Sequence, residues 1–455
     1  MAKKKSRSYY RRRKRKIMAI LRIAAVALVV IAIVVVAVVI IVNHNASSAP
    51  KTQVIVDDNG ETTEVEVNTE TGYAPGPPSP AVVSTASVGA TGDILLHNSV
   101  LNGALQDDGS YDFSASFTDI AAYWSAYDYM IVNLEVPCGG DDDPTGYPVF
   151  DAPDSIVTAL KDAGVDMCLT ATNHAYDCRT TGLTHTQELL NEEGLDHVGT
   201  RLSEDESYVL IKDINGIKFG FACYTYDTRS DPDEDKSLNG IAMDADAADL
   251  VNSFCYSDLD SLYASVSEDL KTMDSAGCDV TVFFMHWGDE YTDYPNSYEE
   301  EISQEMCNLG VDMIVGGHPH VIQEFDVLNG SSGNTTYCLY SMGNAISSQR
   351  RDVMNEDDYR GYTEDGLVFS FTYEKLNNGK VKLTGVDVLP TWVEVGNNGT
   401  YYIDPLDPSL SSDAWPVGST AYGVESYNRT MGRIGDAYPA LRAELGQSEV
   451  PASVE

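Results

Sequence analysis

The residues best suited to chemistry gather in five polar clusters, each at the end of a short apolar run. Carboxylates, amides and histidines recur in the segments 92–97, 133–135, 172–177, 286–290 and 317–320. Five of the eight histidines of the chain fall within these clusters, and no cysteine does. Mixed oxygen and imidazole ligands suit Mn, Fe or Zn better than Ca. We therefore expect a site for a divalent metal ion.

The strongest candidates also have more ordinary interpretations. Asp93 follows a glycine and could cap a helix or make an Asx turn. Glu135 follows an apolar run, where burial without a cation or a basic partner is costly. His286 could be a satisfied core histidine. His318 and His320 flank a proline, and a tight extended turn there would direct both imidazoles to one place, unless the segment is a surface loop.

Two further clusters leave their roles open. Asn173 and His174 put an amide oxygen beside an imidazole, which is either a two-ligand unit or a strand-end turn. His97, four residues beyond Asp93, is expected either to contact a substrate or to pack locally.

Alternating strands and helices must bring these clusters together. Seven apolar runs predict strands, at Thr85–Thr91, Tyr129–Asn133, Asp166–Ala171, Ile217–Tyr224, Cys278–Met285, Val311–Val315 and Tyr337–Ser341. Four stretches between them predict helices, at Pro153–Ala163, Gly182–Glu193, Leu259–Ala276 and Tyr298–Leu309. A hairpin is expected over 366–373 and 381–389, around Asn-Asn-Gly. This pattern is typical of an α/β fold with largely parallel strands in two sheets, whose ligands bind beyond the carboxyl ends of the strands.

Six segments in order resemble the CapA family of poly-γ-glutamate capsule synthesis proteins. They read GDILLH, NLE, TNH, HWG, GHPHV and YSMGN, at 92–97, 133–135, 172–174, 286–288, 317–321 and 340–344. The resemblance extends from about Ser84 to Val393. That family is similar to the calcineurin-like metallophosphoesterases, so the resemblance implies a four-layer α/β/β/α metallophosphatase-like sandwich with a dinuclear metal site.

The resemblance also implies roles for individual residues. Metal ligands would be Asp93, Glu135, Asn173, His286, His318 and His320. His174 falls where the leaving group is polarised, and Asp177 could orient it as a general acid. Substrate contacts are expected from His97, Trp287 and Asn344. In two places the chain departs from the phosphoesterase pattern: Leu95 stands where a histidine is expected, and Glu135 where the bridging ligand is an aspartate. Whether one ion or two bind is therefore open.

An apolar stretch near the N-terminus predicts a membrane anchor. Ile23–Val42 contains only Ala, Val, Ile and Leu, and twenty helical residues span the hydrocarbon core of about 30 Å. Eleven Lys and Arg residues precede it, which predicts a cytoplasmic segment 1–22 and a single-pass protein of the cell membrane whose main domain is extracytoplasmic. A cleaved signal peptide is the alternative, with residues 46–49 as a cleavage site.

The remainder of the chain is expected to have three parts. Residues 43–83 predict a Pro/Thr-rich linker, and residues 84–395 a CapA-like metallophosphatase-fold domain. Residues 396–455, rich in Gly, Pro, Ser and Asp, predict an irregular acidic extension. The eight cysteines lack a Cys-x-x-Cys pair, and we assign no disulfides.

Charge excludes one class of partner. All 70 Asp and Glu residues follow Val42, as against 18 of the 29 Lys and Arg residues, and such a domain repels nucleic acid. The resemblance implies a membrane-anchored protein in the synthesis, export or attachment of poly-γ-glutamate, with the polymer and the synthetase components as partners. An exported metallophosphoesterase or other hydrolase, and a non-catalytic scaffold of the synthetase, are the alternatives. If the protein is an enzyme, we expect a metal-dependent hydrolase or transferase.

Overall fold

The computed structural model describes residues 52–56, 62–66 and 80–455, apart from 141–142, 352, 355–361 and 419. The chain divides into two compact units, Met1–Ser79 and Pro80–Glu455. The predicted span Ile23–Val42 and its basic flank lie outside the described residues. Among the helices that the structure does describe, none is long and apolar enough to cross a bilayer.

The first unit contains a hairpin within the predicted linker. Strands β1 (Thr52–Val56) and β2 (Thr62–Glu66) pair antiparallel. Both strands are rich in β-branched residues, which favour extended backbone. The prediction of a linker was based on the overall composition of residues 43–83, so these two strands were not predicted.

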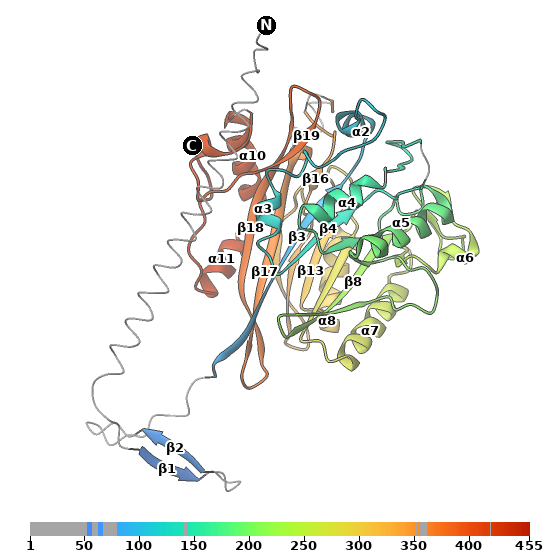
Figure 1. Cartoon of the computed structure of the whole chain (residues 1–455). Helices are drawn as coiled ribbons and strands as arrows, with labels where there is room; N and C mark the ends of the chain where they lie inside the picture. The colour runs from blue at the N-terminus through green and yellow to red at the C-terminus, as the bar shows by residue number, and fades with distance from the viewer. Residues whose placement is uncertain are drawn as a thin grey trace. The chain divides into compact units, whose positions relative to one another are not determined.

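A mixed sheet in the second unit combines the first strands of the fold with its last ones (Figure 1). Its strand order is β19-β18-β17-β3-β4-β5-β6, with β16 paired to β3. The parallel strands are β3 (Val82–Ile94), β4 (Tyr129–Leu134), β5 (Met167–Leu169), β6 (Asp196–Val198) and β16 (Asn344–Ile346). The antiparallel strands are β17 (Asp365–Leu376), β18 (Val381–Val395) and β19 (Tyr401–Pro405).

A second mixed sheet is formed by the middle of the chain, from β7 to β15. Its order is β11-β8-β12-β13-β15-β14, with β7 paired to β8. The parallel strands are β8 (Ile217–Tyr226), β11 (Ser253–Phe254), β12 (Val280–His286), β13 (Met313–Gly317) and β15 (Thr335–Leu339). The antiparallel strands are β7 (Leu210–Ile214) and β14 (Phe325–Asn329). A separate small ladder joins β9 (Ser237–Leu238) and β10 (Ile241–Ala242).

The two sheets pack against each other, and helices cover their outer faces. Neighbouring residues of a strand point to opposite faces. In β4, Ile131 belongs to the core that both sheets share, whereas Val132 packs in the cluster that includes α4 and α5. In β12, Val282 faces the shared core and Phe283 the cluster that includes α7 and α8. These helices are α4 (Ser155–Asp162), α5 (Arg179–Glu193), α7 (Leu259–Ser275) and α8 (Ser297–Leu309). Three shorter helices are α2 (Asn98–Ala104), α3 (Ala121–Trp124) and α6 (Ala245–Ala248).

The predicted α/β class with two sheets is confirmed. Each of the seven predicted strands and four predicted helices is present, with ends shifted by a few residues, and β17 and β18 form the predicted hairpin. Local chemistry explains the clear boundaries of α8. Asn296 and Glu299 form a capping box at its start, and Gly310 ends it in the left-handed conformation (φ 105°).

The expectation of irregular structure over residues 396–455 is wrong. Strand β19 extends the first sheet, and two helices follow, α10 (Thr420–Arg433) and α11 (Ala437–Glu444). Short 3₁₀ turns lie at Tyr362–Glu364 and Ser412–Ala414. The whole segment belongs to the same compact unit as the sheets.

Tertiary contacts account for helix α10, whose sequence contains two glycines and several poor helix formers. Tyr427 is fully buried against Trp392 and Trp415. Arg429 makes two hydrogen bonds, of 2.6 and 2.7 Å, to the buried carboxylate of Asp365 in β17. Packing therefore overrides weak intrinsic helix propensity here.

Candidate metal centre

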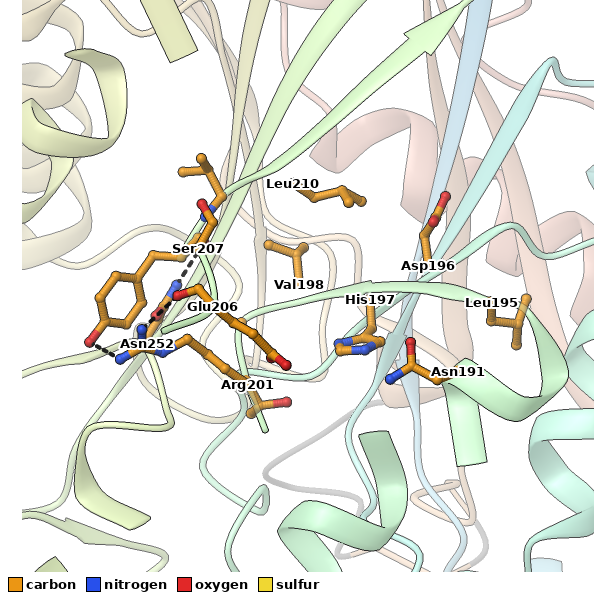
Figure 2. A pocket seen from close by; sticks show the side chains of 14 residues that line it. Asn191, Leu195, Asp196, His197, Val198, Arg201, Glu206, Ser207, Leu210 and Asn252 are labelled. Atoms are coloured by element: carbon orange, nitrogen blue, oxygen red, sulfur yellow. Dashed lines mark hydrogen bonds between the residues drawn. The ribbon is translucent and has the colours of Figure 1, made fainter. Parts of the chain in front are cut away.

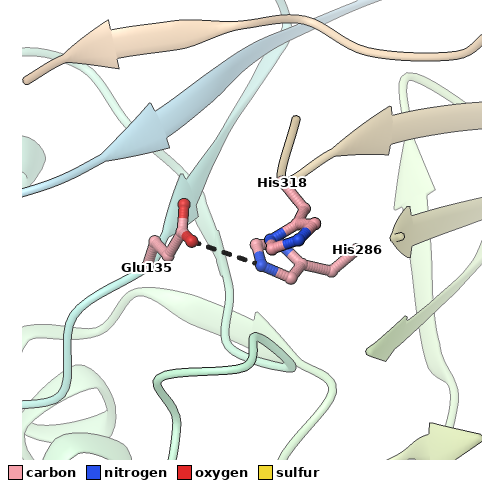
Figure 3. A group of neighbouring side chains, drawn as sticks. All are labelled: Glu135, His286 and His318. Carbon is pink, nitrogen blue, oxygen red and sulfur yellow. Dashed lines mark ion pairs between the residues drawn. The ribbon is translucent and has the colours of Figure 1, made fainter. Parts of the chain in front are cut away.

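Carboxylates and histidines from both sheets meet where parallel strands end. Asp93 is the penultimate residue of β3, and Glu135 directly follows β4 in the first sheet. His286 ends β12, and His318 directly follows β13 in the second sheet. Figure 3 shows Glu135 facing the imidazoles of His286 and His318. The predicted convergence of clusters at strand ends is therefore what the structure shows.

One group of ligand atoms surrounds His320. Its Nδ1 lies 2.9 Å from Oδ2 of Asp93 and 3.9 Å from Oε2 of Glu135. Asn133, the last polar residue of β4, donates from Nδ2 to the other carboxylate oxygen of Asp93 at 2.7 Å. Asp93, Glu135 and His320 lie close enough together to share one cation.

A second group surrounds His286. Its Nε2 lies 2.8 Å from Oδ1 of Asn173 and 3.3 Å from Oε1 of Glu135. The rings of His286 and His318 have centroids 4.9 Å apart. Glu135, His286 and His318 again lie close enough to share a cation. Glu135 belongs to both groups, with one carboxylate oxygen towards each.

The unpaired atoms at this point fit a cation. Both carboxylate oxygens of Glu135 are buried and accept no hydrogen bond from the described residues, and Nδ1 of His318 has no partner among them either. Burying a carboxylate in this way is costly unless a positive charge compensates. The donor set of carboxylates, imidazoles and one amide oxygen suits a divalent transition metal.

Burial sets the ionisation of these groups. It lowers the pKa of His286 to about 3 and that of His318 well below its usual value, and neighbouring imidazoles add to both shifts. These rings are therefore neutral, which is the form that binds metals. Burial, then the charge of Asp93, raises the pKa of Glu135 well above its ordinary value. For Asp93, burial would raise the pKa, but the hydrogen bond and charge of His320 outweigh it and lower the pKa.

The backbone that carries the paired histidines is strained. His318 has φ 94° and His320 has φ 58°, so the extended turn predicted from the proline between them is wrong. Left-handed backbone is costly for residues with a side chain and persists where the surroundings enforce it. Gly317 leaves room for the close approach, since a Cβ there would lie 3.1 Å from Oδ1 of Asp93.

A histidine–carboxylate pair lies beside the two groups. His174 Nδ1 contacts Oδ2 of Asp177 at 2.7 Å, and that same oxygen accepts a hydrogen bond from the amide of Phe150 at 2.8 Å. Asn239 donates from Nδ2 to Oδ1 of Asp177 at 2.9 Å. Both carboxylate oxygens are thus engaged, which fixes the orientation of the imidazole and leaves Nε2 to face a ligand.

The family model described as bacterial capsule synthesis protein PGA_cap matches residues 87–349, a segment that contains every residue of these groups. The chain belongs to the PGA_cap family. This family is part of the metallophosphoesterase-like superfamily, and the resemblance to CapA proteins found from six short segments is confirmed.

Two curated relatives of this PGA_cap protein come from bacilli. The chain is 27% identical over 236 residues to the PGA biosynthesis protein CapA of Bacillus subtilis (strain 168), covering 51% of this chain and 53% of that protein. It is 26% identical over 289 residues to the capsule biosynthesis protein CapA of Bacillus anthracis, covering 62% of each. The chain thus matches less than two thirds of the length of either relative.

Solved structures show only distant likeness. Haemophilus influenzae NAD nucleotidase (NadN) aligns with a TM-score of 0.42 and 12% identity, over 80% of this chain and 59% of that one. A hypothetical protein from Thermus thermophilus aligns with a TM-score of 0.37 and 13% identity, over 67% of this chain and 98% of that one. At these scores the likeness supports no inference about the PGA_cap domain.

The predicted ligands of the PGA_cap domain are all brought together. None of the six is more than 4% exposed: Asp93, Glu135, Asn173, His286, His318 and His320. Leu95, which stands in place of a histidine in the phosphoesterase pattern, is 1% exposed and packs in the core beneath α4 and α5. It offers nothing to the site.

The three predicted substrate contacts lie in different surroundings. His97 is partly exposed, and its ring packs edge-on against Phe150, which in turn contacts His174. Burial lowers the pKa of His97 to about 4, so this ring is neutral. Trp287 and Asn344 are completely buried, and their roles as substrate contacts stay predictions. Trp287 lies in the core of the second sheet and donates to the carbonyl oxygen of Tyr340 at 3.0 Å.

Two positioning asparagines escaped the sequence analysis. Asn133 holds Asp93 and also lies 3.3 Å from Nδ1 of His286. Asn133 begins the Asn-Leu-Glu segment that ends in the predicted ligand Glu135, and this position could have indicated its role. Asn239 holds Asp177 from a loop where its own φ is 49°, and no motif distinguishes it.

A cavity of about 210 Å³ lies apart from this centre (Figure 2). Its lining includes His197, Arg201 and Asn252, and shares no residue with the metal-binding groups. Arg201 makes hydrogen bonds to the carbonyl oxygens of Glu204 and Glu206 at 3.0 and 2.8 Å, which hold the loop at one side of the cavity. We assign this cavity no part in the candidate centre.

Proposed function

We propose that this protein takes part in making, exporting or attaching poly-γ-glutamate at the bacterial cell surface. Membership of the PGA_cap family supports this, as do the two relatives whose names refer to PGA and capsule biosynthesis. In this proposal residues 23–42 anchor the chain in the cell membrane, and the metallophosphatase-like α/β/β/α domain works outside, beside the synthetase components.

We further propose that the domain holds Mn, Fe or Zn between its two sheets. The observation that carries this is Glu135, a buried carboxylate that accepts no hydrogen bond from the part of the chain that the structure describes. It faces His320 on one side and His286 on the other. Its two oxygens could serve two ions. A bound cation would polarise a carbonyl or phosphoryl oxygen and make a neighbouring water more acidic.

In the proposed reaction, His174 supplies the proton. Asp177 holds Nδ1, so the proton passes from Nε2 to the departing group of an amide or ester. Asn239 and the amide of Phe150 keep Asp177 in place while the imidazole changes its charge. General acid catalysis of this kind contributes about 10²–10⁴-fold to a rate.

The His174–Asp177 pair equally favours a second candidate, an exported metallophosphoesterase, because a phosphoester also needs a protonated leaving group. Both substrates are anionic, and the acidic domain repels them unless bound cations compensate. The third alternative, a non-catalytic scaffold, requires neither the cation nor the proton donor.

A complementation experiment tests the proposal. A strain that lacks the gene receives the wild type, Glu135→Gln, His174→Asn or the control His185→Asn, whose half-buried histidine pairs with Asp154 at the start of α4. Surface poly-γ-glutamate, protein level and bound metal are measured for each. We expect both site variants to lose polymer and the control to retain it. Full polymer with Glu135→Gln and His174→Asn would refute the catalytic proposal in favour of the scaffold.

A further inference from the structure

Asn344 lies beside Asp93, in a position that the family pattern does not assign to the metal. It begins β16, which pairs parallel to β3 with Asn344 directly opposite Asp93. Side chains at paired positions of neighbouring strands lie next to each other on one face of a sheet. Asn344 is completely buried, so its amide faces the interior at the edge where the cation would bind.

The hydrogen bonds of Asn344 fix which end of its amide faces the centre. Its Nδ2 lies 3.0 Å from Oε1 of Gln349, 3.0 Å from the carbonyl oxygen of Thr363 and 3.3 Å from that of His320. All three are acceptors, so the nitrogen belongs on that side. Oδ1 therefore points the other way, where Nδ1 of His320 lies 3.1 Å from it.

The spacing of these atoms matches the coordination shell of a small divalent cation. For bonds of about 2.1 Å in an octahedron, adjacent ligand atoms are about 3.0 Å apart and opposite ones about 4.2 Å apart. Around Nδ1 of His320, the distances are 2.9 Å to Asp93, 3.1 Å to Asn344 and 3.9 Å to Glu135. Two neighbours and one nearly opposite ligand are thus already in place.

We propose that Oδ1 of Asn344 is a fourth protein ligand of the cation held by Asp93, Glu135 and His320. It replaces the histidine that the phosphoesterase pattern would place at Leu95, whose side chain packs in the core. The inference rests on the metal centre proposed above. The competing explanation is that Asn344 only accepts a hydrogen bond from His320 and braces the loop through its Nδ2.

Two substitutions separate these roles, because the ligand role needs the oxygen and the bracing role needs the nitrogen. Asn344→Asp keeps an oxygen and loses the donor, whereas Asn344→Ala loses both. Gln349→Ala is the matched control, since it removes one partner of Nδ2 and leaves Oδ1 untouched. The full chain is titrated with Mn²⁺ alone, by calorimetry and by electron paramagnetic resonance, and thermal midpoints report folding.

We expect Asn344→Ala to weaken Mn²⁺ binding by more than about 100-fold, which exceeds the roughly 10–100-fold cost of losing an outer contact. Asn344→Asp and Gln349→Ala should stay within about threefold of wild type, a difference below 1 kcal/mol. Equal losses in the Asp and Ala variants, with folding intact, would establish the bracing role and overturn the inference. If Asn344→Ala does not fold, a loss above about 10-fold in Asn344→Asp overturns it by itself.

The wild type distinguishes failure of the inference from failure of the centre. If it binds no Mn²⁺, both the proposed metal centre and the role of Asn344 fall. If it binds Mn²⁺ and Asn344→Ala binds equally well, only the role of Asn344 falls. Glu290, an exposed carboxylate within reach of His318 and His320, is the rival for this place. A loss with Glu290→Gln but none with Asn344→Ala would assign the position to Glu290.

Discussion

Replacing Glu135 by glutamine should stabilise the metal-free protein and weaken its response to metal. The carboxyl group is buried, accepts no hydrogen bond from the described residues and lies beside Asp93. Without a cation, folding must either protonate this group or bury its charge unpaired. Glutamine keeps the shape of the side chain and removes the charge.

The size of the effect depends on pH. The ordinary pKa of this carboxyl is 4.5, and burial followed by Asp93 raises it well above that in the folded protein. Above pH 4.5 this carboxyl is ionised in the unfolded chain and must bind a proton when the chain folds. The free energy of unfolding therefore falls as pH rises. The penalty is therefore up to about 3 kcal/mol at pH 7 and less than about 1 kcal/mol at pH 5. An unpaired buried amide costs about 1–3 kcal/mol, so Glu135→Gln should gain of order 1 kcal/mol at pH 7 and nothing at pH 5.

Added metal should make the wild type more stable to unfolding than Glu135→Gln. A ligand at one hundred times its dissociation constant stabilises by about 2.7 kcal/mol, and only the wild type retains the shared anionic ligand. Urea unfolding at pH 5 and pH 7, with EDTA or Mn²⁺, measures this through the fluorescence of the buried Trp124 and Trp287. Glu268→Gln, at an exposed position, is the control. A variant less stable than wild type in EDTA at pH 7, or equally stabilised by Mn²⁺, would refute the reasoning.

Three other changes test separate parts of the structure. His174→Asn should keep bound Mn²⁺ while lowering any hydrolytic rate about 10²–10⁴-fold, whereas His185→Asn should change neither; a parallel loss of metal would make His174 a ligand. Burial raises the pKa of Asp269 to about 6 from 3.8. Asp269→Asn should therefore raise the unfolding free energy by up to about 3 kcal/mol at pH 7 and by little at pH 4. An effect that does not change with pH would contradict this. Arg429→Met should cost about 3–5 kcal/mol in urea unfolding by leaving Asp365 unpaired; if the added change Asp365→Asn recovers none of this loss, the pair is not its cause.

The elements that position the centre were readable from the sequence. Apolar runs bounded by polar clusters predicted strands such as β4 and β12, because burial on both faces demands continuous apolar residues. The same clusters predicted the meeting of Glu135 with His286 and His318, since strand ends in α/β sheets share one edge.

Other features depend on contacts that no local pattern records. The left-handed backbone at His318 and His320 is imposed by the surroundings, against the preference of a residue before proline. Helix α10 exists because Tyr427 and Arg429 find partners in the sheet. Trp287 was expected to contact a substrate beside His286, and alternation along the chain turns its side chain into the opposite core.

The division of the centre between two sheets also determines when it can form during folding. Asp93 and His320 are 227 residues apart in the sequence; Asp93 lies in β3 of the first sheet, and His320 in the loop that follows β13 of the second. Closing such a long loop is slow, and neither sheet alone offers a complete set of ligands. Interactions that are absent from the transition state slow unfolding without accelerating folding. A bound ion would therefore connect the two sheets only after the transition state of folding. It would lower the unfolding rate, and so lengthen the lifetime of the native state, without raising the folding rate.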